Sequence, residues 1–342
     1  MNVVPVANHL RHALNLKPQE VALRKELDEW LPQVIIDCHA HCNLEAHVKH
    51  VSDYAYKHMM TSFTHLSLED SDVLRDLFFP FRKVRSLRFP KTFRGIDHRA
   101  ANEYLLHESP EDDRIAVFGL PEDFDYTVGI MRHPRASALK MYWSYVDPPA
   151  KKIYDFFTPE ILEEAQALDL PIILHLPKMI VHTCDDLMTV LSDFPHLRVV
   201  LAHLGLSKLL VPGLEEAYRR AARSPNVWLD TALNPSPEVV SLALECFGRD
   251  RIMFGSDEPL NLLRSVAYRH PEKGERIVTD YQYHWVDPAE YAEYGYLAKD
   301  AVHAQWQCTL AIKKAIEGYP LEEQEELKAL IFQKTAEHVF GF

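Results

Sequence analysis

The stretch Val34-Ile35-Ile36-Asp37-Cys38-His39-Ala40-His41 decides the predicted fold. It begins with three β-branched apolar residues and ends with two histidines at a spacing of two. In an extended chain alternate side chains point to the same side, so we expect His39 and His41 to project together. A buried strand that ends in polar side chains is typical of α/β enzymes, which place functional residues at the carboxyl ends of parallel strands.

Seven further apolar runs follow the first one along the chain. They show little alternation of apolar and polar residues, which indicates parallel strands that are buried on both faces. The first predicted strand covers residues 34–36. The others cover residues 84–89, 114–118, 137–142, 171–175, 197–203, 226–229 and 251–254.

The segments between these strands carry helix signals. Ser236-Pro237-Glu238 combines an N-cap residue, a proline at the first helical position and an acidic first turn, and Gly248 marks the end of that helix. Thr158-Pro159-Glu160 opens another helix in the same way. Alternating strands and helices predict an α/β fold with a parallel sheet and right-handed crossovers. Eight such units, with no glycine-rich phosphate loop after the first strand, favour a closed (β/α)8 TIM barrel over an open doubly wound sheet.

The chain is longer than a plain barrel requires. It has 342 residues, whereas a (β/α)8 barrel takes roughly 250. We expect one TIM-barrel domain over residues 1–342, with a leading helical extension at 1–30 and two excursions at 43–83 and 260–300. Both excursions leave the carboxyl ends of strands, so they are expected to wall the active site. Residues 321–342 are predicted to form an amphipathic closing helix.

The composition limits the partners and the compartment. Lys and Arg number 37 and Asp and Glu number 50, which gives a net charge of −13. Such a chain is not expected to bind nucleic acid or an anionic membrane, both of which require clustered positive charge. The five scattered cysteines suit free thiols in a reducing cytoplasm. We therefore expect a cytoplasmic protein that acts on a small molecule, and the sequence leaves a homo-oligomer open.

Histidines and one aspartate stand at the ends of several predicted strands. His175 ends the fifth strand, His203 ends the sixth, and Asp257 follows the eighth. In a barrel these positions meet His39 and His41 on one rim. Neutral imidazoles with one carboxylate suit Zn²⁺, Mn²⁺, Fe²⁺ or Co²⁺, with a water molecule completing the shell. Of these ions, zinc is the one that we expect.

These motifs, taken in order, resemble a known family. The pattern resembles the motif series of the amidohydrolase superfamily, and within it the amidohydrolase 2 group of aminocarboxymuconate-semialdehyde decarboxylase-like enzymes. The segments that carry the resemblance are Ile36-Asp37-Cys38-His39-Ala40-His41, Leu174-His175, Leu201-Ala202-His203-Leu204-Gly205 and Phe254-Gly255-Ser256-Asp257-Glu258-Pro259. Residues 331–342 also look like the closing helix of that group, so the resemblance runs from about residue 34 to the end of the chain.

The resemblance implies a role for each residue of the motifs. His39, His41, His175 and Asp257 match the metal ligands, and Asp257 also orients or deprotonates the metal-bound water. His203 matches a histidine beside that water, which acts as an acid–base or electrostatic group in members with one metal ion. Whether His203 is itself a ligand stays open.

Lys140 lies in the fourth predicted strand, where members with two metal ions carry a carboxylated lysine bridge. We expect one ion rather than two, and a carbamate, a contact with an anionic substrate and a structural pairing all remain open for Lys140. Lys178, Arg94 and Tyr142 are further candidates for contact with the substrate.

Two acidic residues within these motif segments are expected to have supporting roles. Asp37 is expected to orient a neighbouring histidine or to cap backbone groups. Glu258 stands where the group more often has an aromatic residue, and we expect it to pair with a surface arginine.

The resemblance implies hydrolysis, in which a metal-activated water attacks an amide, a lactone or a related carbonyl bond. An alternative is the non-oxidative decarboxylation of an aromatic or unsaturated carboxylic acid, for which a lysine or arginine clamp and aromatic walls would face the metal. A non-catalytic barrel that binds a metal is the third hypothesis.

Overall fold

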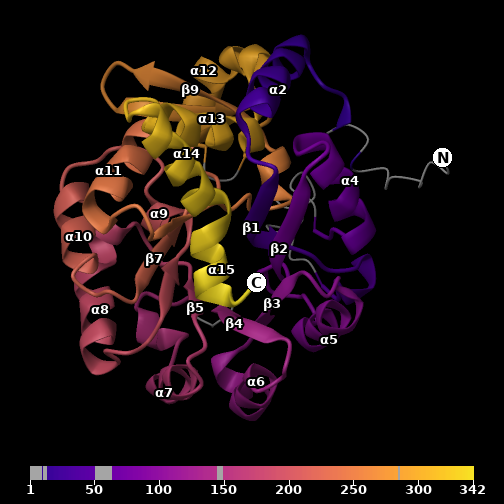
Figure 1. The fold of residues 1–342 in the computed structure, drawn as a ribbon, viewed down its shortest axis with the longest axis vertical. Helices are drawn as coiled ribbons and strands as arrows, with labels where there is room; N and C mark the ends of the chain where they lie inside the picture. Colours follow the sequence, from indigo (N-terminus) through magenta and orange to yellow (C-terminus); the bar gives the residue numbers. More distant parts are fainter. Residues whose placement is uncertain (1–9, 11–13, 51–63, 145–148, 284–285) are drawn as a thin grey trace.

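A computed structural model describes residues 10, 14–50, 64–144, 149–283 and 286–342 of the chain. Eight parallel strands form one sheet in chain order, and helices surround it (Figure 1). The strands are β1 (Val34–His41), β2 (Lys83–Phe89), β3 (Arg114–Phe118), β4 (Ala136–Met141), β5 (Ile172–Leu174), β6 (Val199–Leu201), β7 (Val227–Asp230) and β8 (Ile252–Met253). All eight predicted strands are confirmed, with ends that differ by a few residues from the predicted ones.

The end of β8 returns to β1. The backbone N–H of Cys38 donates to the carbonyl of Phe254 at 3.0 Å, and the N–H of His41 donates to the carbonyl of Glu258 at 2.8 Å. The N–H of Asp257 donates to the carbonyl of His39 at 2.8 Å. These bonds join the first and last strands, so the predicted (β/α)8 barrel is confirmed.

Helices follow most strands and cover the outside of the barrel. They are α4 (Leu68–Phe78), α5 (His98–Glu108), α6 (Phe124–Met131), α7 (Pro159–Ala167), α8 (Ile180–Asp193), α10 (Leu214–Ala221) and α11 (Pro237–Phe247). A buried four-residue segment, α9 (His203–Leu206), precedes α10 and has left-handed backbone angles. The predicted capping of α11 is confirmed, because the Ser236 hydroxyl accepts from the N–H of Val239 at 3.3 Å and Gly248 ends the helix with φ 92°. Short 3-10 turns occupy Glu45–His47, Pro121–Asp123, Ile153–Asp155, Leu260–Leu262 and Gly295–Asp300.

The last part of the chain contains a small second sheet. Its antiparallel strands are ordered β10 (Gly274–Thr279), β9 (Arg264–His270) and β11 (Val302–His303), and α12 (Pro288–Tyr294) lies between β10 and β11 in the chain. The sequence indicated only a polar excursion here, because β9 is buried only at its first two residues and β11 has only two residues. This sheet and the leading helix α2 (Pro18–Trp30) lie at the same end of the molecule in Figure 1.

The chain ends in three further helical segments. They are α13 (Ala304–Ile316), α14 (Leu321–Ala329) and α15 (Thr335–Phe340), and a π-helical turn at Leu330–Lys334 joins the last two. Residues 51–63 of the predicted excursion at 43–83 lie outside the described residues. No helix in the described part of the chain has the length and apolar character needed to cross a membrane.

The core has two layers that the barrel wall separates. Ile35, Ile172 and Leu174 face the helices, whereas Ile36 and Ile173 belong to the cluster inside the barrel. Both faces of the strands are therefore apolar, which explains the absence of alternation in the sequence.

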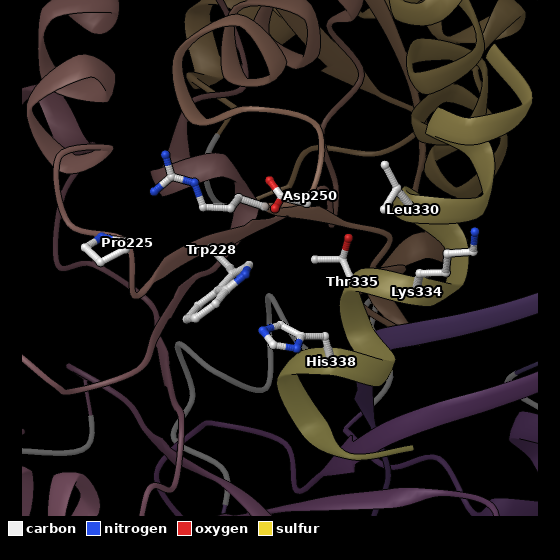
Figure 2. Close-up of a pocket in the computed structure, with 8 residues that line it drawn as sticks. Pro225, Trp228, Asp250, Leu330, Lys334, Thr335 and His338 are labelled. Atoms are coloured by element: carbon white, nitrogen blue, oxygen red, sulfur yellow. The ribbon is translucent and has the colours of Figure 1, made fainter. Parts of the chain in front are cut away.

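The end of the barrel at which the strands begin has a cavity of about 320 Å³ (Figure 2). It lies where β7 and β8 begin and α15 packs against them. Its walls are Pro225, Trp228, Asp250, Arg251, Leu330, Lys334, Thr335 and His338. None of these residues belongs to the predicted metal set.

Candidate metal centre

The predicted site residues lie at the carboxyl ends of different strands. His39 and His41 end β1, His175 follows β5, His203 follows β6 and Asp257 follows β8. All are buried except His175, which is partly exposed. The barrel thus brings together residues that are far apart in the sequence.

A β-bulge in β1 aims the histidine pair. The register of β1 against β2 shifts between Asp37 and Ala40, so that three steps along β1 match two steps along β2. Without this shift, His39 would face away from the interior position of Cys38. The His39 and His41 rings instead contact Phe89, which belongs to the interior cluster, with centroids 4.9 and 4.5 Å away.

Two imidazoles converge on one carboxylate oxygen. His41 Nε2 lies 3.1 Å from Asp257 Oδ1, and His39 Nε2 lies 3.5 Å from the same oxygen. Ligand atoms of these three residues all lie within 4.8 Å of one another. The structure therefore assembles three of the four predicted ligands into a compact group.

His175, the fourth predicted ligand, does not belong to this compact group of three, and its ring contacts that of His203. The centroid of the His203 ring is 4.8 Å from that of His39 and 5.1 Å from that of His175. The Tyr142 hydroxyl is 3.5 Å from His175 Nε2. The four histidine rings thus form a continuous row across the barrel mouth.

The Nδ1 atom of each histidine in the row makes a hydrogen bond with an oxygen atom. The partners are Asp230 Oδ2 for His39 at 2.9 Å, the Pro90 carbonyl for His41 at 2.9 Å, the Leu176 carbonyl for His175 at 2.9 Å and the Ala232 carbonyl for His203 at 3.0 Å. Because these oxygens accept hydrogen bonds, the proton of a neutral ring belongs on Nδ1. Each Nε2 then has a free lone pair, as metal-binding histidines require.

The protonation states suit ligands for a cation. Burial lowers the pKa of His41 to about 3 and that of His203 to about 4, and it holds the pKa of His175 well below its usual value. Burial would raise the pKa of Asp257, but its close contact with His41 and the nearby His39 and His203 rings hold it well below the ordinary value. At neutral pH His41, His175 and His203 are thus neutral imidazoles, and Asp257 is an ionised carboxylate.

Asp230 is a member of the site that the sequence analysis missed. Besides His39 Nδ1, it accepts from the N–H of His203 at 2.8 Å and from the N–H of Ala232 at 3.1 Å through Oδ1. Its oxygens are thus occupied in positioning the two histidines. The predicted seventh strand stopped at residue 229, one residue before this strand-end carboxylate, and that position was the available signal.

Asp37 supports the backbone rather than a ring. Its Oδ1 accepts from the N–H of His39 at 3.0 Å and from the N–H of Ser256 at 2.9 Å, and the Ser256 hydroxyl donates to Oδ2. It thereby ties the bulge of β1 to the turn after β8. In that turn Asp257 has a left-handed backbone with φ 62°, a conformation that non-glycine residues adopt mainly at special sites.

The partner expected for Glu258 was wrong. Its carboxylate is buried, accepts from the Ser71 hydroxyl of α4 at 2.6 Å, and interacts electrostatically with Arg88, which is fully buried rather than at the surface. Burial raises the pKa of Glu258 to about 7, and Arg88 and Ser71 offset only part of that effect. The pairing of its backbone with β1 places Glu258 beside α4, whose partly exposed Arg75 also interacts with it electrostatically.

The predicted substrate contacts separate into two groups. Lys140 is buried in β4, with its Nζ 5.3 Å from the Phe89 ring centroid and 5.9 Å from that of Tyr142. Lys140 and Tyr142 thus lie beside the histidine row. Lys178 and Arg94 are exposed.

The residues present fit a divalent cation. His39, His41 and Asp257 supply two imidazole nitrogens and one carboxylate oxygen within one small volume, and hydrogen bonds at Nδ1 hold the two rings. Nitrogen and oxygen donors of this kind suit zinc and its first-row neighbours.

Comparisons with known proteins agree with this geometry. A family model described as amidohydrolase matches residues 36–342. No curated protein matches the chain in sequence. Among solved structures, an amidohydrolase from Burkholderia multivorans with bound zinc has a TM-score of 0.60 at 14% identity, over 90% of this chain and 99% of its own.

Two further similar structures represent different reactions. A 5-carboxyvanillate decarboxylase from Novosphingobium aromaticivorans, complexed with manganese, has a TM-score of 0.57 at 12% identity, over 91% of this chain and 96% of its own. A probable 2-pyrone-4,6-dicarboxylic acid hydrolase from Acinetobacter baumannii has a TM-score of 0.57 at 14% identity, over 90% of this chain and 99% of its own. At these identities the likeness shows the fold alone.

Proposed function

Because this chain belongs to the amidohydrolase family, whose members are enzymes, we propose that it is a metal-dependent hydrolase of a small-molecule amide, lactone or related carbonyl bond. The observation that carries the proposal is the convergence of His39 Nε2 and His41 Nε2 on Asp257 Oδ1, with both rings held at Nδ1. We propose one ion, zinc, held by these three residues with His175 as the fourth ligand. When bound, such an ion lowers the pKa of water from 15.7 to about 7.

Asp257 and His203 would handle the protons of the attacking water. Asp257 is ionised, so it accepts the proton that the attacking water loses. His203 is neutral and its Nδ1 donates to the Ala232 carbonyl, so its Nε2 orients the water as an acceptor or takes the proton onward.

Two groups beside the histidine row, Tyr142 and Lys140, would stabilise the carbonyl oxygen of the substrate. Burial raises the pKa of Tyr142, so its hydroxyl keeps its proton and donates a hydrogen bond. Burial lowers the pKa of Lys140 to about 8, which leaves it charged at neutral pH. A positive charge and a donor near the developing oxyanion lower the barrier for attack on a carbonyl.

Non-oxidative decarboxylation is the second candidate. The observation that favours it is the buried ammonium group of Lys140 between the aromatic rings of Phe89 and Tyr142, because such a clamp with aromatic walls would hold a carboxylate. The carboxyvanillate decarboxylase among the similar structures acts on a substrate of this kind.

The two candidates are separated by their products. Purified protein with added zinc or manganese should be incubated with lactones, amides and aromatic carboxylic acids, while released acid and released CO₂ are followed. We expect acid release that stops when a chelator removes the metal and returns with zinc. CO₂ release without hydrolysis would replace the first candidate by the second.

A further inference from the structure

The cavity where β7 and β8 begin contains none of the residues of the candidate metal centre. Its volume of about 320 Å³ is within the range of sites that bind small organic molecules. One wall is α15 with the π-helical turn before it, and the facing wall is formed where the two strands begin (Figure 2). Protein interiors are close-packed and leave few voids of this size, so the cavity is suited to a ligand.

Thr335, in the α15 wall, has a buried hydroxyl group without a partner. The residue is 3% exposed, and its Oγ1 makes no hydrogen bond within the described part of the chain. A threonine inside a helix often donates to the carbonyl four residues before it. Here that carbonyl, of Ile331, accepts from the N–H of Phe254 at 2.8 Å, and the backbone N–H of Thr335 donates to Leu330 across the π-helical turn. The hydroxyl is therefore available, and a buried polar group is unfavourable until something binds to it.

Arg251, in the facing wall, has one nitrogen left for a ligand. Backbone carbonyls anchor the guanidinium group, which donates from Nε at 2.6 Å and from Nη1 at 2.8 and 3.1 Å. Its Nη2 makes no hydrogen bond with any residue that the structure describes. Among the described ion pairs within 4.0 Å, none involves Arg251. The side chain is thus held in place with a free donor and a positive charge.

The lining of the cavity carries more positive than negative charge. Arg251 and Lys334 are the cationic residues, and Asp250, which interacts electrostatically with Arg251, is the acidic one among the described residues of the lining. The chain as a whole has a net charge of −13, so this balance is unlike that of the rest of the molecule. A ligand with a single negative charge would complement it.

Flat rings form another part of the lining. Figure 2 shows the ring of His338 extending from α15 toward that of Trp228, and the two centroids are 6.2 Å apart. His338 lies three residues after Thr335, so both side chains are on one face of the helix. Pro225 and Leu330 add apolar surface. These surfaces suit a planar ring rather than a bare inorganic anion.

We propose that this cavity is a second binding site, for a small hydroxylated aromatic monocarboxylate. Arg251 Nη2 binds the carboxylate, and the Thr335 hydroxyl on the facing wall binds a hydroxyl group of the ring. The ring itself lies against Trp228 and His338. The inference does not rest on the proposed function, because no residue of the metal centre takes part in it.

The indole N–H signals in proton–nitrogen correlation spectra of the purified protein locate the binding. The chain has five tryptophans, and the Trp228 signal is the one that Trp228→Phe removes. We expect this signal to shift when an isomer of hydroxybenzoate is added, and its shift gives the affinity at this cavity. A Trp228 signal that none of the isomers moves would overturn the inference, even if hydroxybenzoate bound elsewhere in the chain.

Matched ligands test the chemistry of the site in the native protein. The hydroxybenzamide of the same shape should bind roughly tenfold more weakly or worse, because it lacks the charge that Arg251 binds. Benzoate should bind roughly three- to tenfold more weakly than hydroxybenzoate, because it leaves the Thr335 hydroxyl without a partner. Equal affinities of acid and amide, or equally tight binding of inorganic phosphate, would contradict the proposed ligand class.

Variants assign the two polar contacts. Thr335→Val keeps the shape of the side chain and should abolish the preference for hydroxybenzoate over benzoate. Thr189→Val, on the exposed face of α8, is the control and should keep that preference. Arg251→Met should abolish the preference for the acid over the amide, whereas Arg223→Met, at an exposed position, should not. Circular dichroism shows that each variant is folded, and a hydroxyl preference that survives Thr335→Val contradicts the assignment.

Discussion

The ring of His39 is held between two carboxylates. Its Nδ1 is 2.9 Å from Asp230 Oδ2, and its Nε2 is 3.5 Å from Asp257 Oδ1. Burial would raise the pKa of Asp230, but His39 and the neighbouring His203 hold it below the ordinary value. An ionised Asp230 fixes the proton of His39 on Nδ1 and makes Nε2 a better donor to a cation.

Asp230→Asn should therefore weaken metal binding while leaving the ligands in place. An amide at this position no longer enforces the tautomer of His39, and we expect metal affinity to fall by roughly 10–100-fold. Competition with a chromophoric zinc chelator measures the change. Asp125→Asn, an exposed position on α6, serves as the control. An unchanged affinity in Asp230→Asn would show that the carboxylate does not position the ligand.

Buried neutral histidines make the metal-free protein sensitive to acid. The pKa values of His41 and His203 are about 3 and about 4 in the folded chain, against about 6.5 when unfolded. Below pH 6.5 the unfolded chain takes up protons that the folded chain does not, so the stability contributed by these residues is lost as the pH falls.

Between pH 7 and pH 5 each of these histidines should remove about 2 kcal/mol from the free energy of unfolding. Glu258, whose folded pKa is raised to about 7, acts in the opposite direction and offsets about one of them. Burial also depresses the pKa of His175, so the net change is a loss. Urea unfolding of metal-free protein at the two pH values measures it, and greater stability at pH 5 would contradict the account.

At the level of elements, α4 is attached to the barrel through a buried network of charges. Arg88 of β2 donates to Asp113 at 2.6 Å and to Ser71 of α4 at 2.9 Å. Arg75 of α4 donates to Asp113 at 3.1 Å, and the Ser71 hydroxyl donates to Glu258 at 2.6 Å. This network connects Asp113, the residue before β3, with Glu258, the residue after Asp257. It therefore stabilises the packing of α4 against the strands that carry the site.

Asp113→Asn should destabilise the fold by roughly 3–5 kcal/mol, because it leaves the buried Arg88 without its carboxylate partner. The neighbouring residue offers a matched control. Asp112 pairs with Lys83 where both side chains are about 60% exposed, so Asp112→Asn should change stability by less than about 1 kcal/mol. Chemical denaturation of the two variants tests this, and equal effects would show that burial of the network does not matter.

Sequence patterns predicted the elements of the barrel better than the details inside them. The eight strands follow from apolar runs, since a strand buried on both faces has no other suitable composition. The bulge between Asp37 and Ala40 depends on pairing with β2, which local sequence does not encode. The sheet of β9, β10 and β11 has short and partly exposed strands, so its periodicity is weak.

At the scale of the whole molecule, lysines gather at the barrel mouth although the chain as a whole is acidic. The chain carries a net charge of −13, yet the described mouth of the barrel gathers Lys91, Lys140 and Lys208 around Asp257. Composition averages over the whole chain, so it could not indicate a local cationic site. The histidines and Asp257 were predictable from strand ends, and Asp230 holds the same kind of position at the end of β7. Lys91 and Lys208 required the three-dimensional arrangement.

The metal content of the purified protein tests the central claim most directly. Elemental analysis of protein purified without chelators should give about one equivalent of a transition metal per chain, with zinc as the expected ion. The double variant His39→Asn with His41→Asn should retain less than about a tenth of that amount while its circular dichroism stays native. The account is contradicted if the native protein holds no transition metal after reconstitution with zinc, or if the double variant binds as much as the native chain.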